Sequence, residues 1–180
     1  MSRLSQAIAE GDGISILVEV ADADAAGSAE QDGAEGVAVR RGADAVRAAT
    51  QLPVLHLGGT AAASEASSDA VVVAPDVDAW DEARALGLEC VVRVRNADDV
   101  ERALMELDPE IFLLSAGSDE DPLEVLLALL HDVPAGKLAI AELSDATADD
   151  VAELERAGVD GVLVAAGNVA ALVGAEPPDV

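Results

Sequence analysis

The residue types that most often carry catalysis are scarce in this sequence, which has one cysteine, two histidines and one lysine among its 180 residues. Cys90, His56 and His131 share no spacing typical of a metal site, and no glycine-rich loop with a lysine is present. The best pair for a nucleophilic triad, Ser115 with His56, falls on predicted strands three apart. The sequence therefore predicts no metal and no cofactor, and it leaves carboxylates and arginines as the candidate functional groups.

Eight short apolar runs, rich in β-branched residues, must position those groups. We expect strands at residues 14–20, 36–40, 53–57, 70–74, 90–94, 111–115, 138–142 and 161–165. Most are followed by an Ala/Asp/Glu-rich stretch, and eight β-then-α units predict a compact single-domain α/β protein, a (β/α)8 or TIM barrel. We expect the barrel to span residues 1–174, with a frayed tail at 175–180, and its chemistry to lie at the C-terminal ends of the strands.

The helices of this barrel must be short. Barrels of this class usually have about 250 residues, whereas this chain has 180, or about 22 for each of its eight units. We expect clear helices at 96–108 and at 148–157, the second capped by Thr147. Residues 42–50 and 60–69 barely provide two turns each. One of these two segments is expected to be a loop.

The segment 122–132 differs from the other predicted helices because leucine and valine go almost all the way around it. A helix that is apolar on every face is buried on both sides within its own chain or contributes to a subunit interface. The sequence leaves both interpretations open, and a homo-oligomer formed through 122–132 is one of them.

Acidic residues outnumber basic ones by 36 to 10, which gives a formal net charge of −26. Such a surface repels phosphates and anionic lipids, so we expect no nucleic acid and no membrane as partners. No apolar run approaches the length of about 18–20 residues that crosses a bilayer, and no signal sequence is visible. We expect a cytoplasmic protein. The composition fits a salt-rich cytosol and a high-GC genome equally well.

The C-terminal quarter resembles a known family. Residues 138–164 contain a strand ending in Glu, a Thr-x-x-Asp-Val cap, an Ala-Gly-Val-Asp turn and a Val-Leu-Val strand. This order is similar to the seventh and eighth units of indole-3-glycerol-phosphate synthases, which are ribulose-phosphate-binding barrels. Residues 16–20, 52–55 and 91–94 resemble the first, third and fifth strands of the same family. The resemblance covers most of the chain and implies a phosphate-binding barrel connected with tryptophan biosynthesis.

The resemblance also implies that the synthase chemistry is lost. In the family, lysines stand on the first and third strands and a glutamate on the fifth acts as a base. The matching positions here are Ala21, Leu57 and Arg93. Leucine cannot deliver a proton, and arginine has no acceptor. Of the carboxylates, only Glu19 and Glu142 remain as catalytic candidates.

The phosphate site that the resemblance implies is also altered. The family binds phosphate with Ser-Gly after the seventh strand and Gly-x-Ser after the eighth. Here Ser144, Gly167 and Asn168 stand near these places. They form either an anion-binding nest at the head of the last helix or an ordinary turn that caps it.

If the family register holds, Glu19, Arg93 and Glu142 all point into the barrel. Two carboxylates around one guanidinium would form a nearly neutral structural plug. The alternative is that Arg93, together with Arg40, Arg95 or His56, binds a small anionic or phosphorylated metabolite.

Three functions are compatible with this sequence. The first is a relative of the synthases without their activity, kept in a non-catalytic or regulatory role. The second is an active phosphate-binding barrel of the lyase or isomerase type, acting on a small phosphorylated metabolite through Glu19 or Glu142. The third is a structural subunit that assembles through 122–132. Fold alone does not choose among them, so the residues leave open whether the protein is an enzyme.

Overall fold

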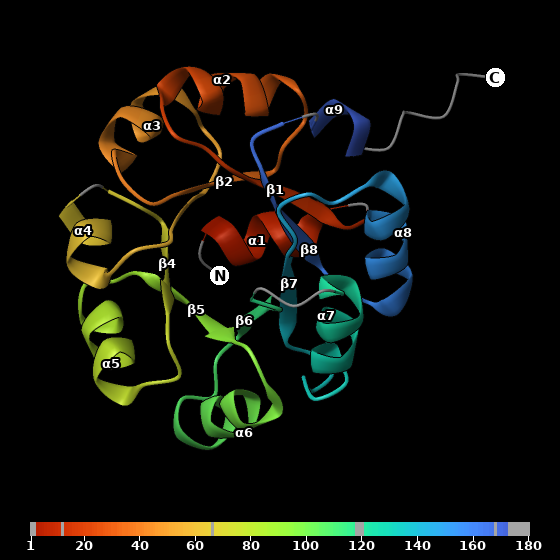
Figure 1. Ribbon diagram of the computed structural model, residues 1–180. Coiled ribbons are helices and arrows are strands. Elements are labelled where there is room, and N and C mark those ends of the chain that lie inside the picture. The colour runs from red at the N-terminus through yellow and green to blue at the C-terminus, as the bar shows by residue number, and fades with distance from the viewer. Residues whose placement is uncertain (1–2, 12, 66, 118–120, 168, 173–180) are drawn as a thin grey trace.

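Eight parallel strands close into a barrel in their sequence order, and helices surround them in the computed structural model (Figure 1). The structure describes residues 3–11, 13–65, 67–117, 121–167 and 169–172. The strands are β1 Ser15–Glu19, β2 Gly36–Val39, β3 Val54–His56, β4 Ala70–Val73, β5 Glu89–Val94, β6 Ile111–Ser115, β7 Leu138–Glu142 and β8 Gly161–Ala165. Each lies within one residue of its predicted bounds, so the TIM-barrel prediction is confirmed. The predicted tail at 175–180 falls outside the described residues.

The helices alternate with the strands and form the outer ring (Figure 1). They are α2 Ala23–Gln31, α3 Ala43–Ala49, α4 Thr60–Glu65, α5 Val77–Ala85, α6 Ala97–Glu106, α7 Pro122–Leu130, α8 Ala148–Ala157 and α9 Val169–Leu172. The expectation that one of the segments 42–50 and 60–69 would be a loop is wrong, because α3 and α4 are both helical. Of the helices in the described residues, none has the length and apolar character needed to cross a bilayer.

A further helix, α1 Arg3–Glu10, lies inside the ring of strands rather than outside it (Figure 1). Leu4 and Ile8 are buried in the cluster of side chains that fills the barrel. The backbone N–H of Ser5 donates to Oε2 of Glu89, 3.2 Å away, at the first residue of β5. The helix therefore closes the N-terminal end of the barrel and leaves the C-terminal end as the accessible one. This helix is not among those expected from the sequence.

The barrel interior is filled by inward-facing side chains from all eight strands. Those of Leu17, Ala38, Leu55, Ala70, Val72, Val91, Ile111, Leu113, Ile140 and Leu163 form one buried cluster with α1. The Leu17 side chain packs against two glycines, Gly36, its register partner on β2, and Gly161 of β8. A Cβ added at Gly36 or Gly161 would come within 3.3 or 3.2 Å of the Leu17 side chain. Glycine at both positions makes room for the large side chain between them.

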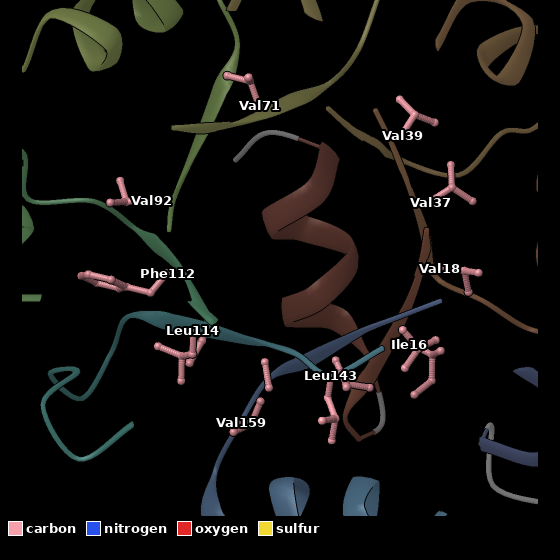
Figure 2. Close-up of a cluster of buried hydrophobic side chains, with 14 of the residues drawn as sticks. Ile16, Val18, Val37, Val39, Val71, Val92, Phe112, Leu114, Leu143 and Val159 are labelled. Atoms are coloured by element: carbon pink, nitrogen blue, oxygen red, sulfur yellow. The ribbon is translucent and has the colours of Figure 1, made fainter. Parts of the chain in front are cut away.

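The side chains on the other strand faces form a second buried cluster between the barrel and its helices. In Figure 2 the labelled strand side chains, such as Val37, Val92 and Phe112, radiate away from the central helix. Side chains on strands alternate between the two faces. An apolar run without polar interruption therefore serves both clusters, which is why the strands are recognisable in the sequence.

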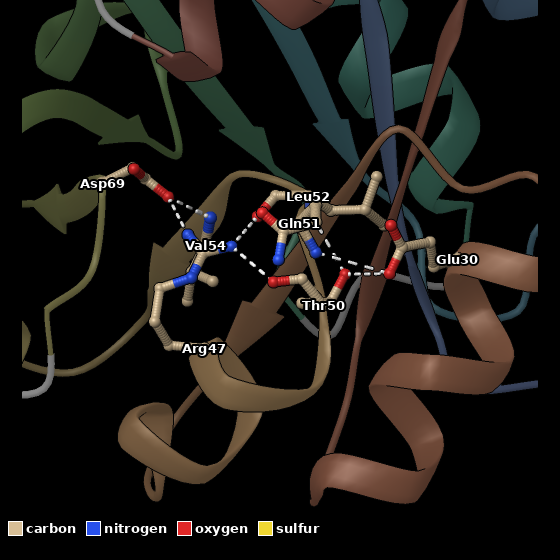
Figure 3. Close-up of polar contacts among 7 residues, drawn as sticks. All are labelled: Glu30, Arg47, Thr50, Gln51, Leu52, Val54 and Asp69. Carbon is tan, nitrogen blue, oxygen red and sulfur yellow. Dashed lines mark hydrogen bonds and ion pairs between the residues drawn. The ribbon is translucent and has the colours of Figure 1, made fainter.

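A polar network ties α3 to the N-terminal ends of β3 and β4 (Figure 3). Nη1 of Arg47 lies 2.6 Å from Oδ2 of Asp69, and its Nη2 donates to the carbonyls of Thr50 and Leu52. The Thr50 hydroxyl in turn donates to Glu30 of α2. These contacts satisfy backbone groups in the turn before β3 and give Arg47 a structural role.

Helix α8 begins and ends at the predicted residues. Thr147 accepts from the backbone N–H of Asp150, whose carboxylate accepts from the Thr147 backbone, and Gly158 ends the helix in the left-handed conformation at φ +97°. These contacts form a capping box, and Thr147 is the cap expected from the sequence.

The apolar helix α7 ends at Leu130, two residues before its predicted end. Leu126 and Leu129 are buried, and Leu123, Val125, Leu127 and Leu130 are partly buried against the same core. Internal packing therefore accounts for its all-round apolar character. A homo-oligomer through 122–132 stays a prediction.

Candidate functional site

The C-terminal ends of the strands, which we call the mouth, carry the charged side chains that the sequence analysis singled out. Each lies two residues beyond an inward-facing residue of its strand, so alternation directs it into the barrel. Four charged residues have this position, which are Glu19, Arg40, Arg93 and Glu142. Leu57 after β3 and Ser115 at the end of β6 occupy the equivalent inward positions without a charge.

Glu19 at the end of β1 forms an ion pair with Arg40, which directly follows β2. The pair is bidentate, with Nε to Oε1 at 2.6 Å and Nη2 to Oε2 at 3.1 Å. The hydrogen bond with Glu19 raises the pKa of Arg40 above its ordinary value despite the opposing effect of burial, and the charges of Glu19 and Glu142 add to it. The Arg40 side chain is 56% exposed, so this pair lies at the rim of the mouth.

Arg93 of β5 reaches across β6 to Glu142 of β7, with Nη2 to Oε1 at 2.9 Å. The two side chains are 18% and 19% exposed, so this pair lies deeper than the first. Nε of Arg93 is buried and has no hydrogen-bond partner among the described residues.

The predicted cluster of Arg93 between Glu19 and Glu142 therefore takes a different form. Glu142 contacts Arg93, but Glu19 contacts Arg40. The reason is topological: β1 and β2 are hydrogen-bonded neighbours, and Arg40 extends the chain just past β2. Two acids and two bases thus balance in two separate pairs.

Leu57 and Ala21 stand where the resembled family has lysines. The Leu57 side chain belongs to the buried cluster inside the barrel and is 8% exposed. Ala21 is exposed and follows β1 by two residues. Leu57 therefore presents an apolar surface to the inside of the mouth.

His56 lies on the opposite face of β3 from Leu55 and Leu57, and it is buried. Its Nδ1 accepts from the backbone N–H of Gly58 at 3.0 Å. Burial lowers the pKa of His56 below its ordinary value. The structure therefore places His56 among the helices, away from the residues that face into the mouth.

The loops after β7 and β8 enclose a cavity of about 370 Å³, and Ser144 and Gly167 line it. The backbone N–H of Val169 donates to the carbonyl of Gly167, and that of Ala165 donates to the carbonyl of Ser144. Asp145 also lines this cavity, and none of the described residues around it is Lys or Arg. Asn168, the third predicted member of this group, lies outside the described residues.

Between β4 and β5 the mouth opens into a cavity of about 430 Å³ that three arginines line: Arg93 of β5, Arg95 just after it and Arg102 of α6. Arg93 and Arg95 are candidates from the sequence, but Arg102 is not. Arg102 belongs to the exposed side of an amphipathic helix, so nothing in the sequence distinguishes it from other surface arginines.

On the other side of the Arg93–Glu142 pair, the mouth has a cavity of about 600 Å³ with several acidic residues. Glu142, Asp121, Asp145 and Asp150 line it. Asp121 and Asp150 accept hydrogen bonds at the N-termini of α7 and α8, so they act as helix caps. Within the part of the chain that the structure describes, no group of three or more His, Cys, Asp or Glu side chains is arranged to hold a metal ion.

Cys90, the single cysteine, is buried and unpaired. Burial raises the pKa of its thiol to about 11, so the unreactive thiol form prevails near neutral pH. It lies on the outward side of β5, in the cluster between strands and helices.

No protein-family model matches this sequence. A segment of 84 residues is 38% identical to the indole-3-glycerol phosphate synthase of Variovorax paradoxus (strain S110). That segment makes up 46% of this chain and 32% of the synthase, so the match spans about a third of the relative's length.

Solved structures resemble the whole barrel. The N-acetylmannosamine-6-phosphate 2-epimerase of Clostridium perfringens superposes with a TM-score of 0.72 at 14% identity, over 87% of this chain and 88% of that one. The fold is shared. Thiamine phosphate pyrophosphorylase of Pyrococcus furiosus gives 0.68 at 17% identity over 88% of each chain. The structure of native KDPGal gives 0.69 at 18% identity, covering 91% of this chain and 93% of that chain.

Proposed function

We propose that this protein binds a small anionic metabolite at the mouth of its barrel and does not carry out the indole-3-glycerol-phosphate synthase reaction. One observation carries the proposal: the four charged side chains that alternation directs into the mouth, Glu19, Arg40, Arg93 and Glu142, are bound to one another in two ion pairs. These charged groups therefore stabilise the mouth by pairing with one another, and none of the four is free to act as an acid or a base.

Acid–base catalysis at this mouth would require a group that is free to give or take a proton. The carboxylates of Glu19 and Glu142 already accept hydrogen bonds from guanidinium groups, and each would have to leave its partner before acting as a base. Leu57 has no proton to give at the inward end of β3. These residues support binding without the turnover that the resembled family performs.

The choice of an anionic ligand rests on the chemistry of the mouth and on the comparisons. Arginine forks match carboxylate and phosphate oxygens, and three arginines, Arg93, Arg95 and Arg102, line one cavity of the mouth. Two of the structurally similar proteins, the epimerase and the pyrophosphorylase, have a phosphorylated compound in their names. The local relative is named for a phosphate ester as well. A phosphorylated or carboxylated metabolite is therefore the ligand class that we propose.

The test is to mix the purified protein with 1-(2-carboxyphenylamino)-1-deoxyribulose 5-phosphate, which carries both a carboxylate and a phosphate. We expect the compound to bind, measured by calorimetry, and no indoleglycerol phosphate to form, measured by its fluorescence. Formation of indoleglycerol phosphate that is lost in Glu142→Gln would show a working enzyme and would contradict the proposal. Failure of this compound and of simple phosphates and carboxylates to bind would contradict it too.

A further inference from the structure

The basic residues of this chain are unevenly distributed. Only 10 residues are Lys or Arg, against 36 acidic ones, yet three of the ten line the cavity between β4 and β5. We propose that this arginine cavity, formed around Arg93, Arg95 and Arg102, is the subsite that binds the oxyanion group of the ligand. This inference rests on the proposed function and gives its anion a location.

The lining of the arginine cavity is partly apolar and partly charged. Leu57 and Val72, which belong to the buried cluster inside the barrel, and Val73 of β4 form its apolar part. The three arginines come from one side, on β5, on the loop after it and on α6. Apolar side chains beside a guanidinium lower the local dielectric constant, and a lower dielectric constant strengthens a guanidinium–oxyanion contact. The cavity thus suits an oxyanion attached to a small organic body.

The donors of these arginines are available to a ligand. Arg93 uses Nη2 for Glu142, but its buried Nε has no acceptor among the described residues. The guanidinium groups of Arg95 and Arg102 make no hydrogen bond or ion pair within the described part of the chain. By contrast, Arg40 and Arg47 are held in ion pairs. Because Nε of Arg93 is buried, the exposed guanidinium groups of Arg95 and Arg102 are the donors that an anion entering the cavity meets first.

The two acids of the arginine cavity do not consume these donors. Oδ1 of Asp76 accepts from the backbone N–H of Ala79 and caps α5. Oδ2 of Asp99 accepts from the backbone N–H of Arg95, 3.1 Å away. Both carboxylates are engaged by backbone groups, and with Glu142, the partner of Arg93, three acids balance the three arginines around the cavity. In a chain of net charge −26, a locally neutral site with unpaired guanidinium groups repels an anion less than the rest of the surface does.

The cavity between the β7 and β8 loops has the opposite character. Its lining includes Asp145, and none of its described lining residues is a cation. Ser144 and Gly167 offer polar groups there without positive charge to balance a phosphate. The structure therefore favours an oxyanion on the β4–β5 side of the mouth over one on the β7–β8 side.

The experiment measures binding of two probes, inorganic phosphate and benzoate, by two-dimensional NMR of the full chain. About 0.1 M NaCl keeps the long-range repulsion of the acidic surface screened, because the Debye length is then about 10 Å. We expect saturable shifts of the Arg93 Nε–H signal and of Arg95 with at least one probe. The double variant Arg95→Gln/Arg102→Gln should weaken that Kd by about tenfold or more, since each change removes a charge-assisted contact.

Three variants serve as controls. Arg84→Gln removes the same charge from the outer surface, where Arg84 lies over the Trp80 ring. Arg41→Gln removes it from the cavity beside β1 and β2, and Ser144→Ala alters the β7–β8 loops. We expect all three to bind like the unaltered protein. Phosphate binding alone would identify a phosphate subsite, and benzoate binding alone a carboxylate subsite.

Two results would overturn the inference, and they differ in what they say of the proposed function. If the probes bind but the double variant binds equally well, the mouth takes an anion elsewhere and only the arginine cavity is wrong. Weakening by Ser144→Ala in that case would place the anion at the β7–β8 loops. If neither probe nor any phosphorylated compound binds the unaltered protein, the proposed function fails together with this inference.

Discussion

The nitrogens of the Arg93 guanidinium differ in what they contact. Nη2 donates to Glu142 across the mouth, while the buried Nε has no acceptor among the described residues. The ion pair stabilises the C-terminal end of the barrel, and the rest of the guanidinium keeps donors that Glu142 does not use. One guanidinium can do both because it has five N–H donors in a fixed plane.

The stability role of Arg93 is measurable in a double-mutant cycle. We expect Arg93→Met to lower the free energy of unfolding by about 2–4 kcal/mol, because it leaves the Glu142 carboxylate without a partner. The loss should be somewhat smaller than the about 3–5 kcal/mol typical of a fully buried pair. Replacing both residues, in Arg93→Met/Glu142→Leu, should restore part of that loss. Urea unfolding measures each value.

Arg40→Met is the matched control, because the Glu19–Arg40 pair is more exposed. It should cost about 1 kcal/mol or less, as surface pairs do. Equal losses from Arg93→Met and Arg40→Met would contradict the difference in burial between the two pairs.

The direction of the mouth residues could be predicted from the sequence, but their partners could not. Strand alternation places Glu19, Arg93 and Glu142 inward once the strands are located. Arg40 was named only as a possible ligand contact, since nothing in the sequence says that it reaches Glu19 before Arg93 does. His56 shows the limit of the same reasoning, because it lies one residue from Leu57 and so faces the helices.

At the scale of elements, α1 is the feature that changes the interpretation of the barrel. It occupies the N-terminal end of the interior and buries Leu4 and Ile8 against the inner side chains. The strands are short, at three to six residues each, so the interior layers they supply are few. The helix completes the core from one end.

We therefore expect Leu4→Ala and Ile8→Ala each to lower the free energy of unfolding by about 2–4 kcal/mol, the usual cost of such truncations in a core. Gln6→Ala on the exposed side of the same helix should stay within about 0.5 kcal/mol of the unaltered protein. Chemical denaturation of the three variants tests this. Similar, small effects at all three positions would show that α1 does not contribute to the core.

The eight strands were predictable because their apolar runs are long enough to serve two buried faces. The helix α1 was not, because its eight residues provide only two large apolar side chains, Leu4 and Ile8, one turn apart, which is too weak a pattern to distinguish from a loop. For α3 and α4 the sequence predicted too little helix, because one of the two segments was expected to be a loop. Both form short helices, since packing against the barrel stabilises helices that would not form alone.

At the scale of the whole molecule, the charge of −26 acts against the compact state. The structure relieves little of this repulsion, since the described residues contain four ion pairs between basic and acidic side chains. Many of the remaining acids lie on exposed helix faces or at helix N-termini, where the helix dipole favours them. The repulsion among them should therefore be sensitive to salt.

Raising NaCl from about 0.02 to 0.3 M should raise Tm by at least about 2–4 °C, the shift that 1 kcal/mol produces in a protein of this size. Differential scanning calorimetry measures it. The increase should level off once the Debye length falls below the spacing of the charges. A Tm that stays flat in this range and rises only at molar salt would indicate general salt effects on hydration in place of screening.

The pairing of β1 with β8 also matters while the chain is being made. The first strand leaves the ribosome early, but its partner on one side is the last strand to be synthesised. Until residue 165 has emerged, β1 and β7 expose unpaired backbone edges that invite contacts with other chains. The barrel can therefore close only after the eighth strand has been made, and until then its two open edges are the places where the nascent chain is most exposed to aggregation.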